Sequence, residues 1–317
     1  MLKISSISLR SVGLVGCWEA ATGVSISSGT KLGLEEAALG AAGAAVGTLA
    51  SAIVNLIVLC IFLVRSNCEF KVKLSEMFPK KEKFFGTYMG KCTPILLNEI
   101  LYGVAQMLIN IVIGRQAESA IAAMAAFRVL EGFVYAFFGG LADAGTVVIG
   151  KEVGSGNHMK GYHYMKGFAI VCPAITFLIC LIFAVFNTSI LSLFGLGAAA
   201  LMYGKYMLYI YLLAGAIRTC NYIMNCGYRA GGETVYGTVV EIGGLFLISL
   251  PAVWVSGMVF KLPFLAIFSF VYTDEILRFI LEIRYTRSGK WVKPVTERGR
   301  EMLPLFYKEL DEYKKGK

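Results

Sequence analysis

Long apolar stretches separated by short charged segments dominate the pattern of hydrophobic and polar positions along this chain. Residues 37–64 contain 28 consecutive positions without a charge, and residues 167–204 contain 38. About 20 consecutive apolar residues are enough for one helix to cross a bilayer. The pattern therefore predicts several helices that cross a membrane.

Seven spans follow from the apolar stretches, and the predicted fold is an all-α polytopic membrane protein. The predicted spans are 37–64, 92–114, 119–149, 167–187, 199–226, 234–258 and 262–283. The last span differs from the others because only its first half, Leu262 to Thr273, is free of charge. Its second half carries charges at spacings of three and four, so they can pair along one helix face. We expect that half to face protein rather than lipid.

The segments outside these spans define the domain organisation. We expect a poorly defined N-terminal segment at 1–36, an isolated helix at 37–64 and a basic linker at 65–91. A six-helix lobe at 92–283 and a basic tail at 284–317 follow.

The distribution of basic residues predicts the orientation. If the linker is cytoplasmic, the inner segments hold most of the Lys and Arg residues, and the outer loops hold only Arg115 and Lys261. This asymmetry follows the positive-inside rule and predicts a cytoplasmic C-terminus. We expect the protein to lie in the plasma membrane.

Composition supports a membrane protein and excludes several other classes. The chain is 57% hydrophobic and 16% charged, against roughly 25% charged in soluble domains. Its net charge of +9 sits in loops, not in a stripe that would bind nucleic acid. The eight cysteines form no C-x-x-C pair, both histidines are close in sequence, and no phosphate-binding motif occurs. We expect no enzyme activity, no metal and no cofactor.

The second span carries a polar face at membrane depth. Glu99, Gln106 and Asn110 fall within about 40° of one line along the helix, with Tyr102 beside it. A carboxylate at this depth needs a partner, water or a proton. It can therefore carry a proton, form a structural pair or, with the neutral oxygens nearby, coordinate a cation. We predict cation or substrate binding, with structural pairing as the alternative.

Arg128 and Glu131 in the third span are further candidates for cation or substrate binding. They are three residues apart, so they can also simply pair with each other within the helix. Arg218 and Arg278 lie near the inner ends of their helices, where we expect them to snorkel to the membrane surface.

Four stretches of the chain resemble one family of transporters. They are YRAGGET at 228–234 followed by Glu241 and Pro251, PILLNEILYG at 94–103, LEGFVYAFFGGLADAGTVVIGKEVGSGN at 130–157, and LGLEEAALGAAGAAVGTLASAI at 32–53. In this order and spacing, over about residues 31–290, they resemble the multidrug and toxic compound extrusion (MATE) antiporters.

The resemblance implies a fold of twelve helices in two six-helix lobes around a central cavity. Entry of a coupling ion, H⁺ or Na⁺, would drive export of amphipathic, often cationic compounds. Glu99 matches an acidic position on the family's seventh helix. The aspartate that one branch carries on its tenth helix has no counterpart in 199–226.

The glycine-rich stretch at 228–234 resembles a cytoplasmic turn of the family. Gly231 and Gly232 give the backbone freedom for a tight turn, and Arg229 anchors it on the positive side. Glu233 lies where the N-terminus of the next helix favours negative charge. Glu241 is only about 10 Å into that helix, so we expect an inter-helix polar contact there.

By this resemblance the chain is a partial transporter. Six of the seven spans match the second lobe, and 37–64 matches only the last helix of the first lobe. We therefore expect an antiporter that needs a missing N-terminal lobe. Two alternatives are a membrane remnant or interaction protein without transport, and a flippase of lipid-linked sugars from the related superfamily.

Overall fold

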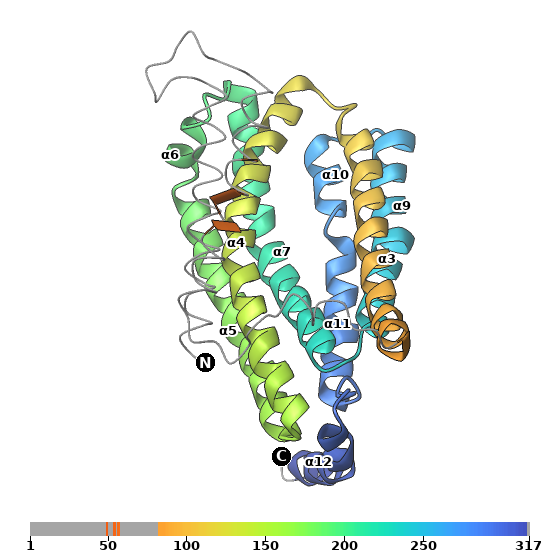
Figure 1. The fold of residues 1–317 in the computed structure, drawn as a ribbon. Coiled ribbons are helices and arrows are strands. Elements are labelled where there is room, and N and C mark those ends of the chain that lie inside the picture. Colours follow the sequence, from red (N-terminus) through yellow and green to blue (C-terminus); the bar gives the residue numbers. More distant parts are fainter. Residues whose placement is uncertain (1–48, 50–52, 55, 58–81, 316–317) are drawn as a thin grey trace. The chain divides into compact units, whose positions relative to one another are not determined.

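The computed structural model describes residues 49, 53–54, 56–57 and 82–315, and every regular element within them is a helix (Figure 1). The predicted segment 1–36, most of the predicted helix 37–64 and most of the linker lie outside the described residues. The chain forms two compact units. The first comprises Met1–Gly86 and Tyr135–Gly140, and the second comprises Thr87–Val134 and Leu141–Lys317. All contacts discussed below lie within the second unit.

Five of the described helices are long and apolar enough to cross a membrane. They are the Cys92–Ile113 part of α3 (Glu82–Ile113), α4 (Glu118–Ser155), α5 (His158–Val185), α7 (Ala198–Ala230) and the continuous helix Val235–Val259. The prediction of an all-α polytopic membrane protein is therefore confirmed.

The turn between α4 and α5 is much shorter than the sequence indicated. We expected a loop between residues 149 and 167, but α4 runs to Ser155 and α5 begins at His158. Gly156, with φ of 91°, closes α4 in the left-handed conformation that favours glycine. Charged residues in this segment end the apolar pattern, but not the helix, because a helix can continue beyond the hydrocarbon layer.

The helix Val235–Val259 contains two wide turns. It consists of α8 (Val235–Gly244), the π-helical turn η3 (Leu245–Ser249), α9 (Leu250–Trp254) and a second π-helical turn η4 (Val255–Val259). Pro251 has no N–H to donate to the preceding turn, which disturbs the regular α-helical hydrogen bonds.

The prediction of one continuous helix at 262–283 is wrong. The structure has two helices, α10 (Phe264–Phe270) and α11 (Thr273–Ser288), with a turn at Val271–Tyr272. Ser249 supports this break, because its hydroxyl donates to the Asp274 carboxylate at 2.6 Å and accepts the Asp274 N–H at 3.3 Å. A neighbouring helix thus satisfies the backbone that a broken helix leaves open.

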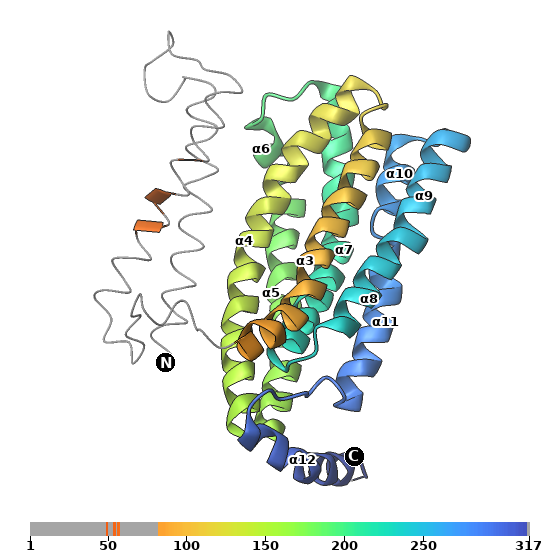
Figure 2. The ribbon, with the colours of Figure 1, turned by 45° about the vertical axis from the view of Figure 1, so that its right-hand side comes forward.

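The predicted basic tail contains a further helix. Residues Glu297–Lys315 form α12, which runs across the ends of the long helices of this unit (Figures 1 and 2). Its buried residues Phe306 and Leu310 join a core cluster with Tyr162 and Met165 of α5 and Trp291. This apolar face fixes α12 on the lobe.

Helices α5 and α7 pack along each other, with the short helix α6 (Asn187–Ser192) between them in the chain. Gly227 of α7 makes this close approach possible, because any Cβ there would overlap the sulfur of Met165. A small residue at a helix contact lets two backbones come together.

The turn between α7 and α8 combines a glycine conformation with a charged cap. Gly232 has φ of 91°, and a Cβ at this position would overlap the carbonyl oxygen of Lys293. The carboxylate of buried Glu233 accepts the N–H groups of Val235 at 2.9 Å and Tyr236 at 3.1 Å, and it pairs with the Lys293 ammonium. Burial acts to raise the pKa of Glu233, but the hydrogen bonds from Lys293 and the two N–H groups outweigh it and lower that pKa.

We predict that Gly232→Ala destabilises the protein by about 2–4 kcal/mol, because it adds both a strained φ and a clash with backbone. The thermal midpoint of the purified protein in detergent measures this. Gly243→Ala is the matched control, since a Cβ there has nothing within 4 Å and alanine favours a helix. Equal midpoints for the two variants would contradict this account of the turn.

The lowered pKa of Glu233 predicts an acid-sensitive contribution to stability. The ionised carboxylate stabilises the fold above its ordinary pKa of 4.5, and this contribution disappears as the pH falls through the lower folded-state pKa. Glu233→Gln should lower the thermal midpoint at pH 7 and make its decline between pH 5 and 3 shallower. The exposed Glu309→Gln serves as control and should follow the unmodified protein. Parallel curves for all three proteins would refute the assignment.

Candidate functional site

The polar face of α3 divides into an open part and a covered part. The Glu99 side chain is 63% exposed, and its carboxylate lies 3.5 Å from the Arg229 guanidinium at the end of α7. Tyr102 and Gln106 are half-buried and Asn110 is exposed. Of these four predicted residues, only Tyr102 reaches a second cluster of charges deeper in the lobe.

That deeper cluster centres on Glu131 of α4, whose carboxylate is buried. Arg128 donates to it at 2.7 Å, Arg218 of α7 at 2.5 Å and the Tyr272 hydroxyl at 3.2 Å. Arg218 also donates to the Tyr102 hydroxyl at 3.0 Å. Arg128 and Glu131 do pair within their helix, but Arg218 and the two tyrosines extend this pair into a contact of four segments.

The prediction that Arg218 snorkels to the membrane surface is therefore wrong. A partner was available on α4, so its guanidinium stays inside the lobe. Its Nε also lies 3.9 Å from the Glu275 carboxylate, which connects the Glu131 cluster to a second one on α11.

The second cluster surrounds Arg278, whose side chain is 7% exposed. Its guanidinium lies near four carboxylates, at 3.4 Å from Glu241, 3.5 Å from Glu275, 3.7 Å from Asp274 and 4.0 Å from Glu282. The prediction that Arg278 snorkels is also wrong. A guanidinium with several charged neighbours gains more from them than from moving to the surface.

Three asparagines complete these clusters, and the sequence analysis did not identify them. Asn98 and Asn225 donate to the Glu241 carboxylate at 3.0 and 2.8 Å, and Asn221 donates to the Glu275 carboxylate at 2.7 Å. The expected inter-helix polar contact at Glu241 is confirmed. An amide within an apolar helix was the available signal, because a buried amide needs a partner.

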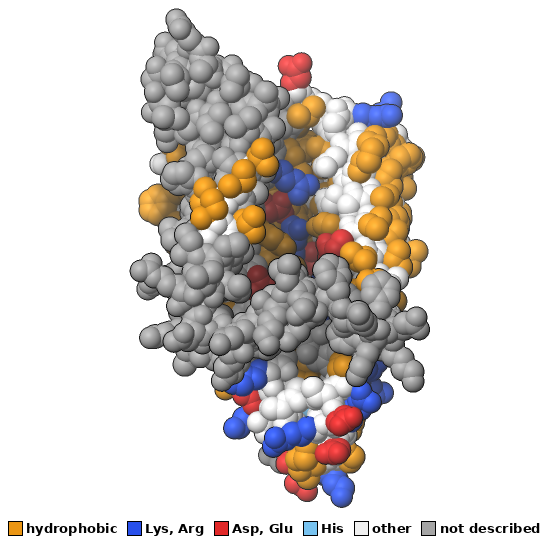
Figure 3. Space-filling model, in the orientation of Figure 1, with side chains coloured by type: hydrophobic (Ala, Val, Ile, Leu, Met, Phe, Trp, Pro, Cys, Tyr) orange, Lys and Arg blue, Asp and Glu red, His pale blue; other side chains and the backbone are white. Residues whose placement is uncertain are grey.

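Among the described residues of this site, carboxylates outnumber guanidinium groups. Six carboxylates pair with four arginines, namely Glu99, Glu131, Glu241, Asp274, Glu275 and Glu282 with Arg128, Arg218, Arg229 and Arg278. Figure 3 shows basic and acidic side chains in a strip between two hydrophobic flanks. Among the residues that the structure describes, no three His, Cys, Asp or Glu side chains are arranged to hold a metal ion.

Comparison with known proteins identifies the class. The model of the MatE family matches residues 94–255, which is half of the chain, so the protein belongs to the MATE family of membrane transporters. Members of this family are transporters and not enzymes, and the protein is a multi-pass membrane protein.

Individual relatives are distant. The uncharacterized transporter YisQ of Bacillus subtilis (strain 168) is 19% identical over 255 residues, which cover 80% of this chain and 56% of YisQ. A solved outward-facing multidrug resistance MATE family transporter of the MOP superfamily has a TM-score of 0.65 and 16% identity. That match covers 86% of this chain and 61% of the other.

The MATE transporter ClbM, solved in complex with Rb⁺, has a TM-score of 0.61 and 17% identity, covering 87% of this chain and 61% of ClbM. The chain thus spans less than two thirds of the length of these relatives. At such identities the solved structures show the shared fold.

We predict that Arg218→Met lowers stability by about 3–5 kcal/mol, because it leaves the buried Glu131 carboxylate with fewer donors. The double variant Glu131→Gln and Arg218→Met should lose less stability than the sum of the two single variants. Each single change leaves one charge of the pair buried without its partner, whereas the double change removes both charges. Thermal midpoints in detergent measure both effects. Arg115→Met, at an exposed arginine outside the cluster, should change little. Strict additivity of the two changes would contradict a shared ion cluster.

Proposed function

We propose that this chain forms the ion-coupling lobe of a secondary antiporter that exports amphipathic, often cationic compounds in exchange for H⁺ or Na⁺. The family membership supports transport in general. The plasma membrane as its location and a cytoplasmic C-terminus belong to the same proposal, based on the distribution of Lys and Arg residues along the chain.

The observation that carries this proposal is the environment of Glu99. Its carboxylate is exposed on the lobe and held by a single long ion pair to Arg229, whereas Glu131 is enclosed by three donors. An ion pair that remains accessible can exchange its partner for a proton or a cation at small cost. Arg229 lies beside the turn that joins α7 to α8, so release of this pair would act directly on a helix end.

The charge balance of the lobe favours a cation over an anion as the coupled species. Carboxylates outnumber arginines among the described charged residues of the site. ClbM, a structural relative, was solved with a bound monovalent cation, Rb⁺. Both points support H⁺ or Na⁺ coupling at an acidic side chain of this lobe.

We further propose that the lobe works together with a second lobe. The relatives are longer than the region that this chain matches, which is 56% of YisQ and 61% of the outward-facing MATE transporter. In the working transporter we infer that the face carrying Glu99 is turned toward that second lobe, so that ion and substrate share one cavity.

The flippase alternative draws support from the four arginines of the site, because an anionic lipid-linked sugar needs cations. Each of these arginines, however, already lies within 4.0 Å of a carboxylate. They neutralise protein charges and leave no excess of positive charge, so the antiporter remains the proposed function.

We predict that Na⁺ stabilises the purified chain and that Glu99→Gln removes the effect. The thermal midpoint is measured in NaCl against choline chloride at constant ionic strength. An ion at 100 times its dissociation constant stabilises by about 2.7 kcal/mol. The exposed Glu118→Gln, outside the site, is the matched control and should keep the response.

The same variants test antiport directly. Coupling and substrate sites that exclude each other must do so reciprocally, so Na⁺ or H⁺ should displace a fluorescent organic cation from the chain. Fluorescence polarisation of the dye reports this displacement. If Na⁺ leaves the midpoint unchanged and neither ion displaces the dye, or if Glu99→Gln responds normally, the proposal fails and an interaction protein without transport becomes the better hypothesis.

A further inference from the structure

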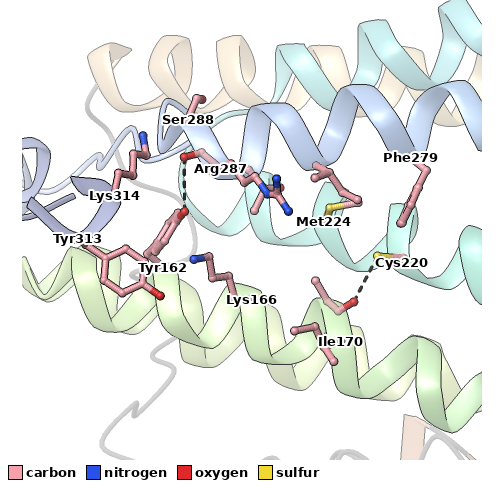
Figure 4. A pocket seen from close by; sticks show the side chains of 13 residues that line it. Tyr162, Lys166, Ile170, Cys220, Met224, Phe279, Arg287, Ser288, Tyr313 and Lys314 are labelled. Atoms are coloured by element: carbon pink, nitrogen blue, oxygen red, sulfur yellow. Dashed lines mark hydrogen bonds between the residues drawn. The ribbon is translucent and has the colours of Figure 1, made fainter. Parts of the chain in front are cut away.

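A cavity lies at the end of the lobe where α12 crosses the long helices. Its volume is about 890 Å³, and 13 residues from α5, α7, α11 and α12 line it (Figure 4). None of the lining residues is acidic. It shares no residue with the two ion clusters described above.

The end of this cavity beside α12 is cationic. Lys166 of α5, Arg287 of α11 and Lys314 of α12 line the cavity, and Figure 4 shows the two lysines on the side of Tyr162 and Tyr313 and the Arg287 guanidinium pointing toward Met224. The Lys166 ammonium lies 4.6 Å from the centre of the Tyr162 ring and 4.7 Å from that of Tyr313. These rings hold the ammonium in place without neutralising it.

The three cations keep their positive charge for a ligand. Within the described part of the chain, no carboxylate lies in ion-pair distance of Lys166, Arg287 or Lys314. This contrasts with the arginines of the ion clusters, each of which has a carboxylate partner. Three cations that line one cavity without an acid favour binding of an anion such as a phosphate.

The other end of the cavity is apolar. Ile170, Cys220, Met224 and Phe279 line it, and Ile170 is 71% exposed. The Cys220 thiol donates to the Ala169 carbonyl, so it offers no free polar group. This surface suits a hydrocarbon chain and would be unfavourable in contact with water.

The position of the cavity in the membrane fits a ligand with both parts. The cationic end lies beside α12, an amphipathic helix that exposes Met302, Leu305 and Tyr307. Such a helix lies in the interface between lipid headgroups and acyl chains. The apolar end follows the long helices α5 and α7 into the hydrocarbon layer.

We propose that this cavity binds one anionic phospholipid. The lipid phosphate contacts Lys166, Arg287 and Lys314, and one acyl chain lies along Ile170 and Phe279. A zwitterionic lipid fits less well, because its cationic headgroup finds no carboxylate among the lining residues. Basic pockets between membrane helices on the cytoplasmic side bind acidic headgroups for the same reason.

Native mass spectrometry of the purified full chain in detergent tests the proposal. The protein is titrated with phosphatidylglycerol and with phosphatidylcholine of the same acyl chains. We expect at least tenfold tighter binding of phosphatidylglycerol. The triple variant Lys166→Gln, Arg287→Gln and Lys314→Gln should lose this preference. The single variant Lys314→Gln, at an exposed residue, should reduce it severalfold even if the triple variant folds poorly.

A matched triple variant removes the same charge from the same helices outside the cavity. Lys160→Gln on α5, Arg284→Gln on α11 and Lys308→Gln on α12 should keep the preference. Equal loss in both triple variants would mean diffuse surface attraction and overturn the proposal, as would equal binding of both lipids. Competition by inorganic phosphate or glycerol phosphate at millimolar concentration would show a simple anion site and would also overturn it.

Discussion

The guanidinium of Arg278 lies inside the lobe with almost no contact to solvent or lipid, and the helices around it are arranged to supply its partners. A charge in this position is costly unless carboxylates and hydrogen bonds compensate it. Glu241 comes from α8, and Asn98 of α3 and Asn225 of α7 hold that carboxylate in turn. Helices that are far apart in the sequence thus acquire a fixed register. Apolar contacts between helices would specify this register only weakly, because lipid tails are as apolar as the helix surfaces.

The same requirement distinguishes the charges that hold the lobe together from the proposed coupling charge. Glu131 satisfies two arginines and a tyrosine, so its carboxylate is committed to holding α4 against α7 and the start of α11. Glu99 has one distant partner and an open side, and its loss would leave few groups unpaired. An exchangeable ion fits a position of this second kind, because binding there need not dismantle the core of the lobe.

The end of the lobe that α12 crosses follows a different rule. There α12 closes the bundle with Phe306 and Leu310, and the turn at Gly232 and Glu233 brings α8 close to the segment that precedes α12. Near this end Lys293 pairs with Glu233, whereas no described carboxylate lies in ion-pair distance of Lys166, Arg287 or Lys314. In the proposed lipid complex, an anionic headgroup supplies the missing negative charge.

Properties that depend on local composition could be predicted from the sequence. The apolar stretches determined the all-α membrane class and most of the spans, because crossing a bilayer requires only length and hydrophobicity. The stretch at 228–234 indicated the turn that Gly232 forms and the helix start that Glu233 caps, since both depend on neighbouring residues. Only the tertiary structure decided the partners of Arg218 and Arg278, the break between α10 and α11, and the exposure of Glu99. A charge pairs with whichever helix lies beside it, and neighbours in space are not encoded by spacing along one helix.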